Sequence, residues 1–251
     1  MQTFISFAPA AWIILSSVCT GLVIRGLALV FKRAGLPGSV RRPLVFRAAA
    51  LGIGWPLLLL GLALTGFFAD FSKLPPRPVL AVLFPLPFFL LAVFSRRSVA
   101  LLRAMPLHWP VYLQAFRIVV ELLLFLACRA GLLPVQMSFE GMNFDVLTGL
   151  LAIYAGYRLQ RDGYRARWVG VVFNGCGLLL LLNILVIALL SMPTPFRVFQ
   201  DGPANTLVGK FPFILLPGVC VPLAYGLHIV SLRQLMGKSF RSGDEHGLTR
   251  R

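Results

Sequence analysis

The sequence predicts an all-α integral membrane bundle of about seven transmembrane helices, with the N-terminus outside and the C-terminus inside. Hydrophobic residues make up 58% of the chain and charged residues only 13%, which is too apolar for the surface of a soluble domain. The apolar residues fall in runs of about 20, the length at which a helix crosses a bilayer with every backbone group paired. The loops between these runs alternate between strongly basic and nearly uncharged, which fixes an orientation.

The apolar runs follow one another with short connections. In chain order we expect spans at 7–31, 47–68, 79–95, 109–130, 144–160, 168–191 and 212–232. No cation precedes the first run: Arg25 lies near its end, and Lys32 and Arg33 follow it, whereas a cleavable signal peptide carries cations before its apolar stretch. We therefore expect a retained span, one seven-helix transmembrane domain over residues 1–232, and a short basic cytoplasmic tail over residues 233–251.

The formal net charge of +16 is distributed unevenly among the loops. Four basic clusters follow the first, third, fifth and seventh spans and belong to one side: Lys32 to Arg47, Arg96 to Arg103, Arg158 to Arg167, and Arg233 to Arg251. Loops with an excess of Lys and Arg stay in the cytoplasm, so this side is predicted to be inside. The same charge also attracts anionic lipid head groups. We therefore expect membrane lipids as partners and no nucleic acid, and the sequence identifies no protein partner.

Prolines interrupt two of the predicted spans. Pro85 and Pro87 lie in the third span, and Pro217 and Pro222 lie in the seventh. Each removes a backbone donor and obstructs the preceding helical turn, so both helices should kink. Kinks in adjacent helices can open a cavity within a bundle.

Polar residues at helical spacing within the fourth span are the main candidates for a ligand-binding site. Gln114, Arg117 and Glu121 project from one face of one helix. At a rise of about 1.5 Å per residue, Glu121 lies on the order of 18 Å beyond Trp109, close to the bilayer centre. A carboxylate there is costly and must be compensated, and Arg117 one turn away is the nearest candidate. Two interpretations stay open: an Arg117–Glu121 pair that holds the bundle in register, or a Glu121 that faces a polar cavity.

The seventh span supplies two further candidate ligand-binding residues, Tyr225 and His228, one turn apart on the same face. His228 could titrate or hold a ligand, and the alternative is an ordinary hydrogen bond to a neighbouring carbonyl. Asn174 and Asn183 in the sixth span face opposite directions, so each should make its own interhelical hydrogen bond.

The outer loops carry acidic and amide side chains. Glu140, Asn143, Asp145 and Asp201 could form an acidic mouth for cations, or a solvated rim neutralised by nearby arginines and lysine. The stretches MSFEGMNFDVLTGL and SMPTPFRVFQDGPANTL resemble segments of uncharacterised bacterial multi-spanning membrane proteins. That resemblance covers mainly the second half of the chain, and it implies a location in the cell membrane, the cytoplasmic (inner) membrane of a bacterium, without implying an activity.

Short catalytic motifs are missing from the sequence, including phosphate-binding glycine loops, zinc-protease helices and nucleophile elbows. We expect no metal site and no cofactor. The working hypothesis is binding or transport of a small polar or amphiphilic molecule in a cavity lined by Gln114, Arg117 and Glu121. The alternatives are a lipid-modifying enzyme acting near His108 and His228 at the inner interface, and an accessory or assembly subunit of a membrane complex.

Overall fold

The computed structural model describes residues 2–237, and its side chains from Phe7 onward. Over this part of the chain every regular element is helical. The helices are α1 (Gln2–Arg33), α2 (Gly38–Leu64), α3 (Arg77–Leu83), α4 (Pro85–Phe94), α5 (Ser98–Ala104), α6 (Trp109–Leu113), α7 (Phe116–Arg129), α8 (Asp145–Asp162), α9 (Arg167–Leu190) and α10 (Val221–Met236). The predicted all-α class is confirmed.

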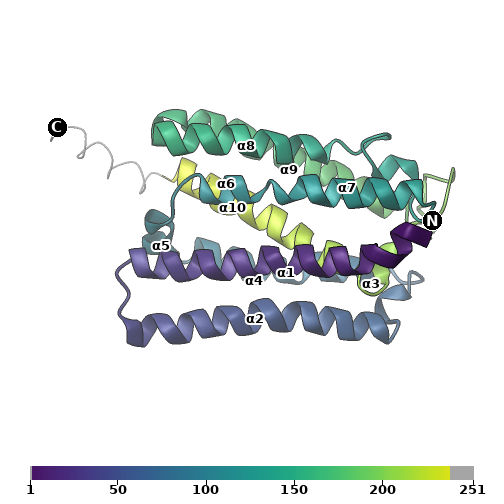
Figure 1. The fold of residues 1–251 in the computed structure, drawn as a ribbon, viewed down its shortest axis with the longest axis horizontal. Helices are drawn as coiled ribbons and strands as arrows, with labels where there is room; N and C mark the ends of the chain where they lie inside the picture. Colours follow the sequence, from purple (N-terminus) through teal and green to yellow (C-terminus); the bar gives the residue numbers. More distant parts are fainter. Residues whose placement is uncertain (1, 238–251) are drawn as a thin grey trace.

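Six helical segments are long and apolar enough to cross a membrane. One of them, Asp145–Leu190, is 46 residues long and contains both α8 and α9, joined by the 3-10 turn Gly163–Ala166. These two helices turn back on each other and pack side by side (Figure 1). The predicted tail extends beyond residue 237, so most of it lies outside the described residues.

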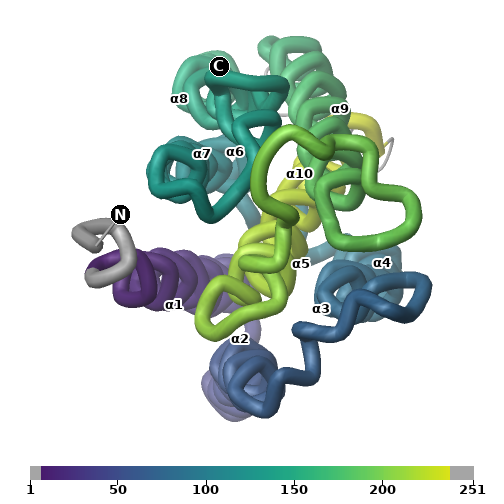
Figure 2. Tube along the Cα trace, turned by 90° about the vertical axis from the view of Figure 1, so that its right-hand side faces the viewer, coloured from purple at the N-terminus to yellow at the C-terminus, as the bar shows by residue number. Residues whose placement is uncertain are grey.

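The helices run roughly along one axis, with α10 crossing the bundle obliquely (Figure 1). Viewed end-on, α10 lies near the centre, with α1, α4, α6 and α9 arranged around it, while α2 lies at the periphery (Figure 2). The α1–α2, α4–α5 and α8–α9 connections and the C-terminal end of α10 share one end of the bundle (Figure 1). The predicted basic clusters that fall within the described residues therefore lie at a common end.

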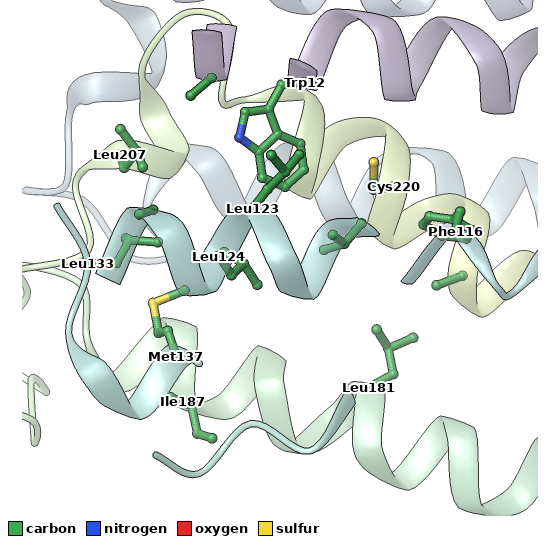
Figure 3. Close-up of a cluster of buried hydrophobic side chains, with 14 of the residues drawn as sticks. Trp12, Phe116, Leu123, Leu124, Leu133, Met137, Leu181, Ile187, Leu207 and Cys220 are labelled. Atoms are coloured by element: carbon green, nitrogen blue, oxygen red, sulfur yellow. The ribbon is translucent and has the colours of Figure 1, made fainter. Parts of the chain in front are cut away.

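The main hydrophobic core joins the N-terminal half of α1, helix α7, the C-terminal half of α9 and the start of α10. Figure 3 shows the Trp12 ring of α1 directed toward Leu123 and Leu124 of α7, with Leu181 and Ile187 of α9 on the opposite side. All five side chains are buried. Each such side chain contributes roughly 1.5–3 kcal/mol when it leaves water, but in lipid the gain comes from close packing, so this cluster fixes how the helices fit together.

The prolines interrupt the third and seventh spans as predicted. Helix α3 ends at Leu83, and α4 begins at Pro85. Before α10 the chain forms a π-helical turn, Leu216–Cys220. Pro222 has no N–H to donate to the Gly218 carbonyl four residues earlier, and the indole N–H of Trp55 donates to that carbonyl instead, at 2.7 Å. The carbonyl that the kink leaves free is thus hydrogen-bonded by a side chain from peripheral α2.

Two glycines bring α8 close to the fourth predicted span. A Cβ on Gly149 would lie 2.5 Å from Ile118, and one on Gly156 would lie 2.6 Å from Tyr112. Any side chain at either position would force the helices apart, so small residues are required here. This close approach places Asp145, the first residue of α8, at the level of Arg117 on α7.

Candidate functional site

Arg117 is the centre of a buried polar cluster within the bundle. Its side chain on α7 is only 1% exposed. The guanidinium Nε donates to Asp145 Oδ2 at 2.7 Å, and Nη2 donates to Asp145 Oδ1. This bidentate geometry is the strongest form of an arginine–carboxylate pair. Of the two interpretations, the one in which Arg117 pairs with Glu121 of its own helix is therefore not the arrangement in the structure, because the start of α8 brings the carboxylate of Asp145 to Arg117.

His228 on α10 joins this cluster from the opposite side. Arg117 Nη1 lies 3.0 Å from His228 Nε2. Because a guanidinium can only donate, Nε2 must accept, which leaves the proton on Nδ1. Nδ1 donates to Asn174 Oδ1 at 2.8 Å, and the Asn174 amide in turn donates to Ser231 Oγ at 2.8 Å. The imidazole is thus held neutral in one tautomer, and its carbonyl partner is the side-chain amide of Asn174 and not a backbone carbonyl.

Gly177 on α9 provides the space that His228 and Arg117 occupy. A Cβ at this position would lie 2.7 Å from His228 Nε2. The Gly177 carbonyl also accepts a hydrogen bond from Arg117 Nη1, at 3.4 Å. A residue without a side chain is therefore required where the three helices α7, α9 and α10 meet.

Glu121 lies one turn beyond Arg117 and takes its partner from a loop. The Asn143 amide donates to Glu121 Oε1 and, at 3.1 Å, to the Met137 carbonyl, while its own carbonyl oxygen accepts from the Asp145 N–H at 3.1 Å. Glu121 is 1% exposed, and its second oxygen, Oε2, has no hydrogen-bond partner among the described residues. Buried polar atoms in proteins almost always have a hydrogen-bond partner, so an unpaired carboxylate oxygen here is unusual.

Asn143 reaches Glu121 because the α7–α8 connection folds back into the bundle. Helix α7 continues for eight residues beyond Glu121, to Arg129, which is about 12 Å of helix. Asn143 nevertheless contacts Glu121, so the connection folds back toward the middle of the bundle. Ser138 and Asn143 are both fully buried in this segment. Irregular backbone at membrane depth is tolerated where protein surrounds it, as here.

A cavity of about 290 Å³ lies beside this cluster. Its walls come from α3, α7, α9 and the π-helical turn, and nearly all of the lining is aliphatic or aromatic. Arg117, Glu121 and Asp145 are the charged residues in the lining. Four other lining residues have side chains that are largely exposed at the bundle surface: Leu83, Leu182, Val186 and Leu189. The cavity thus extends from the lipid-facing surface between α3 and α9 to the buried charges.

Three of the five predicted ligand-binding residues lie outside the cavity wall. Gln114 donates to the Ala224 carbonyl at 2.9 Å and fixes α10 against the turn between α6 and α7. Tyr225 donates to the Val82 carbonyl at 3.2 Å, just before the proline-rich break. His228 contacts Arg117 but does not line the cavity. The predicted lining of Gln114, Arg117 and Glu121 is therefore corrected: Arg117 and Glu121 line the cavity, and Gln114 does not.

The four outer-loop residues that could form an acidic mouth or a neutralised rim do not assemble as one group. Asn143 and Asp145 are buried in the polar cluster, whereas Asp201 is exposed. Glu140 instead lies 3.8 Å from Arg129, in a solvated pair. The sequence offered a signal for Asp145, namely an acid at the first position of an apolar run, where a helix N-terminus favours negative charge. Nothing in the sequence indicated that its partner would be Arg117.

Asn174 makes the predicted interhelical hydrogen bond, to Ser231 on α10. Asn183 bonds the Met142 carbonyl of the α7–α8 connection, at 2.8 Å, so its partner is a loop and not a helix. Over residues 2–237 no group of three or more His, Cys, Asp or Glu side chains is arranged to hold a metal ion.

Comparison with known proteins places the cluster and the cavity within one family region. The model of a domain of unknown function (DUF8737) matches residues 76–236, which include α3 to α10 and every residue of the polar cluster. No curated protein and no solved structure matches the chain.

Proposed function

Because the chain belongs to the family of the domain of unknown function DUF8737, we propose a function from the geometry of its cavity: it binds a small amphiphilic molecule that enters from the membrane. The apolar tail lies between α3 and α9, and the polar end reaches Glu121. The observation that carries this proposal is one cavity that combines an aliphatic lining, exposed mouth residues and a buried carboxylate oxygen with no hydrogen-bond partner within residues 2–237.

The chemistry of the lining supports an amphiphile over a purely polar ligand. Ligand pockets typically have apolar walls with a few polar groups that fix orientation, and volumes from roughly 300 Å³ upward. At about 290 Å³ the cavity suits a small molecule or a single chain. A fully polar solute would lose its hydration against these walls without replacement hydrogen bonds.

The proposal includes a topology. We propose seven spans with the N-terminus outside, the C-terminus inside, and the chain in the cytoplasmic membrane of a bacterium. The α8–α9 hairpin supports the count, since 46 helical residues would extend about 69 Å, more than twice the thickness of a hydrocarbon core. The basic connections at a common end of the bundle support the orientation.

Photo-crosslinking tests the binding proposal. Purified protein in nanodiscs is irradiated with a single-chain amphiphile that carries a diazirine on its tail, and labelled peptides are identified by mass spectrometry. We expect labelling of buried lining residues such as Leu124 and Cys220, which lipid at the bundle surface does not reach.

Two matched variants make the crosslinking test specific. Val186→Trp fills the mouth of the cavity, while Val172→Trp changes the same residue type on the same helix, at a position 62% exposed and outside the lining. Labelling of Leu124 and Cys220 should fall with Val186→Trp and persist with Val172→Trp. Labelling confined to surface residues in all three proteins would refute a binding cavity.

Each alternative has its own expected outcome. A lipid-modifying enzyme acting near His108 and His228 would turn over the bound amphiphile, so the recovered molecule would differ in mass. His108 packs its ring against Tyr112, whereas His228 bonds Arg117 and Asn174, so these interactions do not join the two histidines. An accessory subunit would give no labelling of the buried lining and would purify with a partner protein.

A further inference from the structure

The three charged groups beside the cavity differ in how many of their hydrogen-bonding positions are occupied. This difference defines the head group that the site can accept. Four of the five N–H groups of Arg117 are engaged, because Nε and one N–H of Nη2 bond Asp145, and Nη1 bonds His228 and the Gly177 carbonyl. It therefore offers little to an anionic ligand. Both oxygens of Asp145 are likewise occupied by Arg117. Only Glu121 retains an oxygen without a partner among the charged lining residues.

The balance of charge points in the same direction. The lining contains one cation, Arg117, and two carboxylates, Glu121 and Asp145, so an ionised Glu121 leaves one negative charge uncompensated. An uncompensated charge in a medium of low dielectric constant is strongly unfavourable. A ligand that brings one positive charge with an N–H donor would satisfy both the charge and the free oxygen. An anionic head group would add to the excess.

We infer that the ligand is a cationic amphiphile with a single aliphatic chain and a protonated primary or secondary amine, whose N–H donates to Oε2 of Glu121. This inference rests on the proposed binding function and specifies its ligand class. The amine occupies the end of the cavity where α7 meets the start of α8, and the chain extends past Leu185 toward the exposed mouth residues. Hydrogen bonds between two charged groups are roughly twice as strong as neutral ones, so Glu121 provides selectivity as well as affinity.

Head-group selectivity at constant chain length tests this inference. Protein is placed in phosphatidylcholine nanodiscs, because that lipid carries no N–H donor. Dodecylamine, dodecan-1-ol, dodecanoate and dodecyltrimethylammonium are titrated separately, and binding is measured from the dependence of the melting temperature on concentration. Val186→Trp protein provides the background, because partitioning of the probes into the bilayer affects both proteins alike.

We expect dodecylamine to bind at least about tenfold more tightly than dodecan-1-ol, because both can donate a hydrogen bond to Oε2 but only the amine also supplies the positive charge. Dodecanoate should bind most weakly. Dodecyltrimethylammonium, which has the charge without an N–H, should bind less tightly than the amine. Glu121→Gln should reduce the amine-to-alcohol ratio to about one, and a cooperative thermal melt without any probe shows that the variant is folded.

Two failures are distinguishable. If no probe gives binding that Val186→Trp reduces, the binding function itself is wrong. If amine, alcohol and carboxylate bind equally, or the carboxylate binds best, the cavity stands and the amine inference is overturned. The ranking in the wild-type protein decides this even if Glu121→Gln does not fold.

Native mass spectrometry identifies the source of the amine. Protein extracted gently from its own membrane is compared with protein exposed to added dodecylamine. An adduct already present after extraction, and lost in Glu121→Gln, indicates a resident amino-lipid. An adduct that forms only after addition indicates a cationic amphiphile taken from outside the membrane. Absence of an amine adduct from both samples contradicts the inference.

Discussion

The guanidinium of Arg117 on α7 and the carboxylate of Asp145 at the start of α8 form a buried, two-pronged ion pair, with Nε 2.7 Å from Oδ2. The pair joins two antiparallel helices at the level where the α7–α8 connection folds back into the bundle. Asp145 is also the first residue of its helix, where the aligned backbone N–H groups favour a negative charge. The pair therefore fixes the register of α8 against α7 and the position of the cavity wall.

A double-mutant cycle tests this pair. Arg117→Met alone should lower the free energy of unfolding by roughly 3–5 kcal/mol, because Asp145 is left buried without a counter-ion. Arg117→Met combined with Asp145→Leu should cost clearly less than the sum of the two single changes. The cycle of Arg117→Met with Glu121→Leu is the control and should show a smaller coupling energy. The free energy of unfolding of every protein in the two cycles is measured in mixed micelles. A larger coupling energy in the Glu121 cycle than in the Asp145 cycle would contradict the structure.

The close approach at Gly177 predicts a severe effect from a single methyl group. Gly177→Ala places a Cβ against His228 and should displace the imidazole from Arg117, with a loss of roughly 1–3 kcal/mol, the usual cost of overpacking a core. Gly175→Ala on the same helix is the matched control, because nothing beyond the adjacent backbone of α9 lies within 4 Å of the position that its Cβ would take. It should be neutral or stabilising by about 0.5–1 kcal/mol. Thermal melts that rank the two variants equally would remove Gly177 from this role.

The orientation is tested with single cysteines in a background that lacks the four native ones. Gln200 lies in the α9–α10 connection and Ser39 near the start of α2, and both are exposed at opposite ends of the bundle. Gln200→Cys should react with an impermeant thiol reagent in intact cells, and Ser39→Cys should react only after the cells are opened. The reverse pattern would invert the topology, and reaction of both in intact cells would exclude it.

Asp70, in the connection between α2 and α3, should make stability depend on pH. Hydrogen bonds from Ser72, together with the Arg77 guanidinium at 2.8 Å, lower the pKa of the Asp70 carboxyl below its usual value of 3.8. Because the folded protein holds the charged form, this contribution is present above about pH 4 and is lost as the pH falls through the folded-state pKa. The difference in melting temperature between wild type and Asp70→Asn should therefore be constant near neutral pH and shrink in acid. A difference that grows in acid would contradict this assignment.

The sequence by itself determined the class of the protein, the approximate positions of the apolar spans, and the breaks at Pro85 and near Pro217. These properties depend on local composition: the length of an apolar run sets whether a helix can cross a bilayer, and a proline acts on the turn that contains it. The importance of Arg117 and Glu121 was also predicted, because charge within an apolar run is costly wherever its partner lies.

Only the tertiary structure decided which partners those charges have and which residues line the cavity. Helical periodicity reports which residues share a face, but the register between helices is set by packing, here by Gly149 and Gly156 of α8. That register brings Asp145 to Arg117, and the folded-back connection brings Asn143 to Glu121. It also turns Gln114 and Tyr225 toward backbone carbonyls and away from the cavity. Partner choice depends on contacts between segments distant in sequence, and no pattern within a single span encodes it.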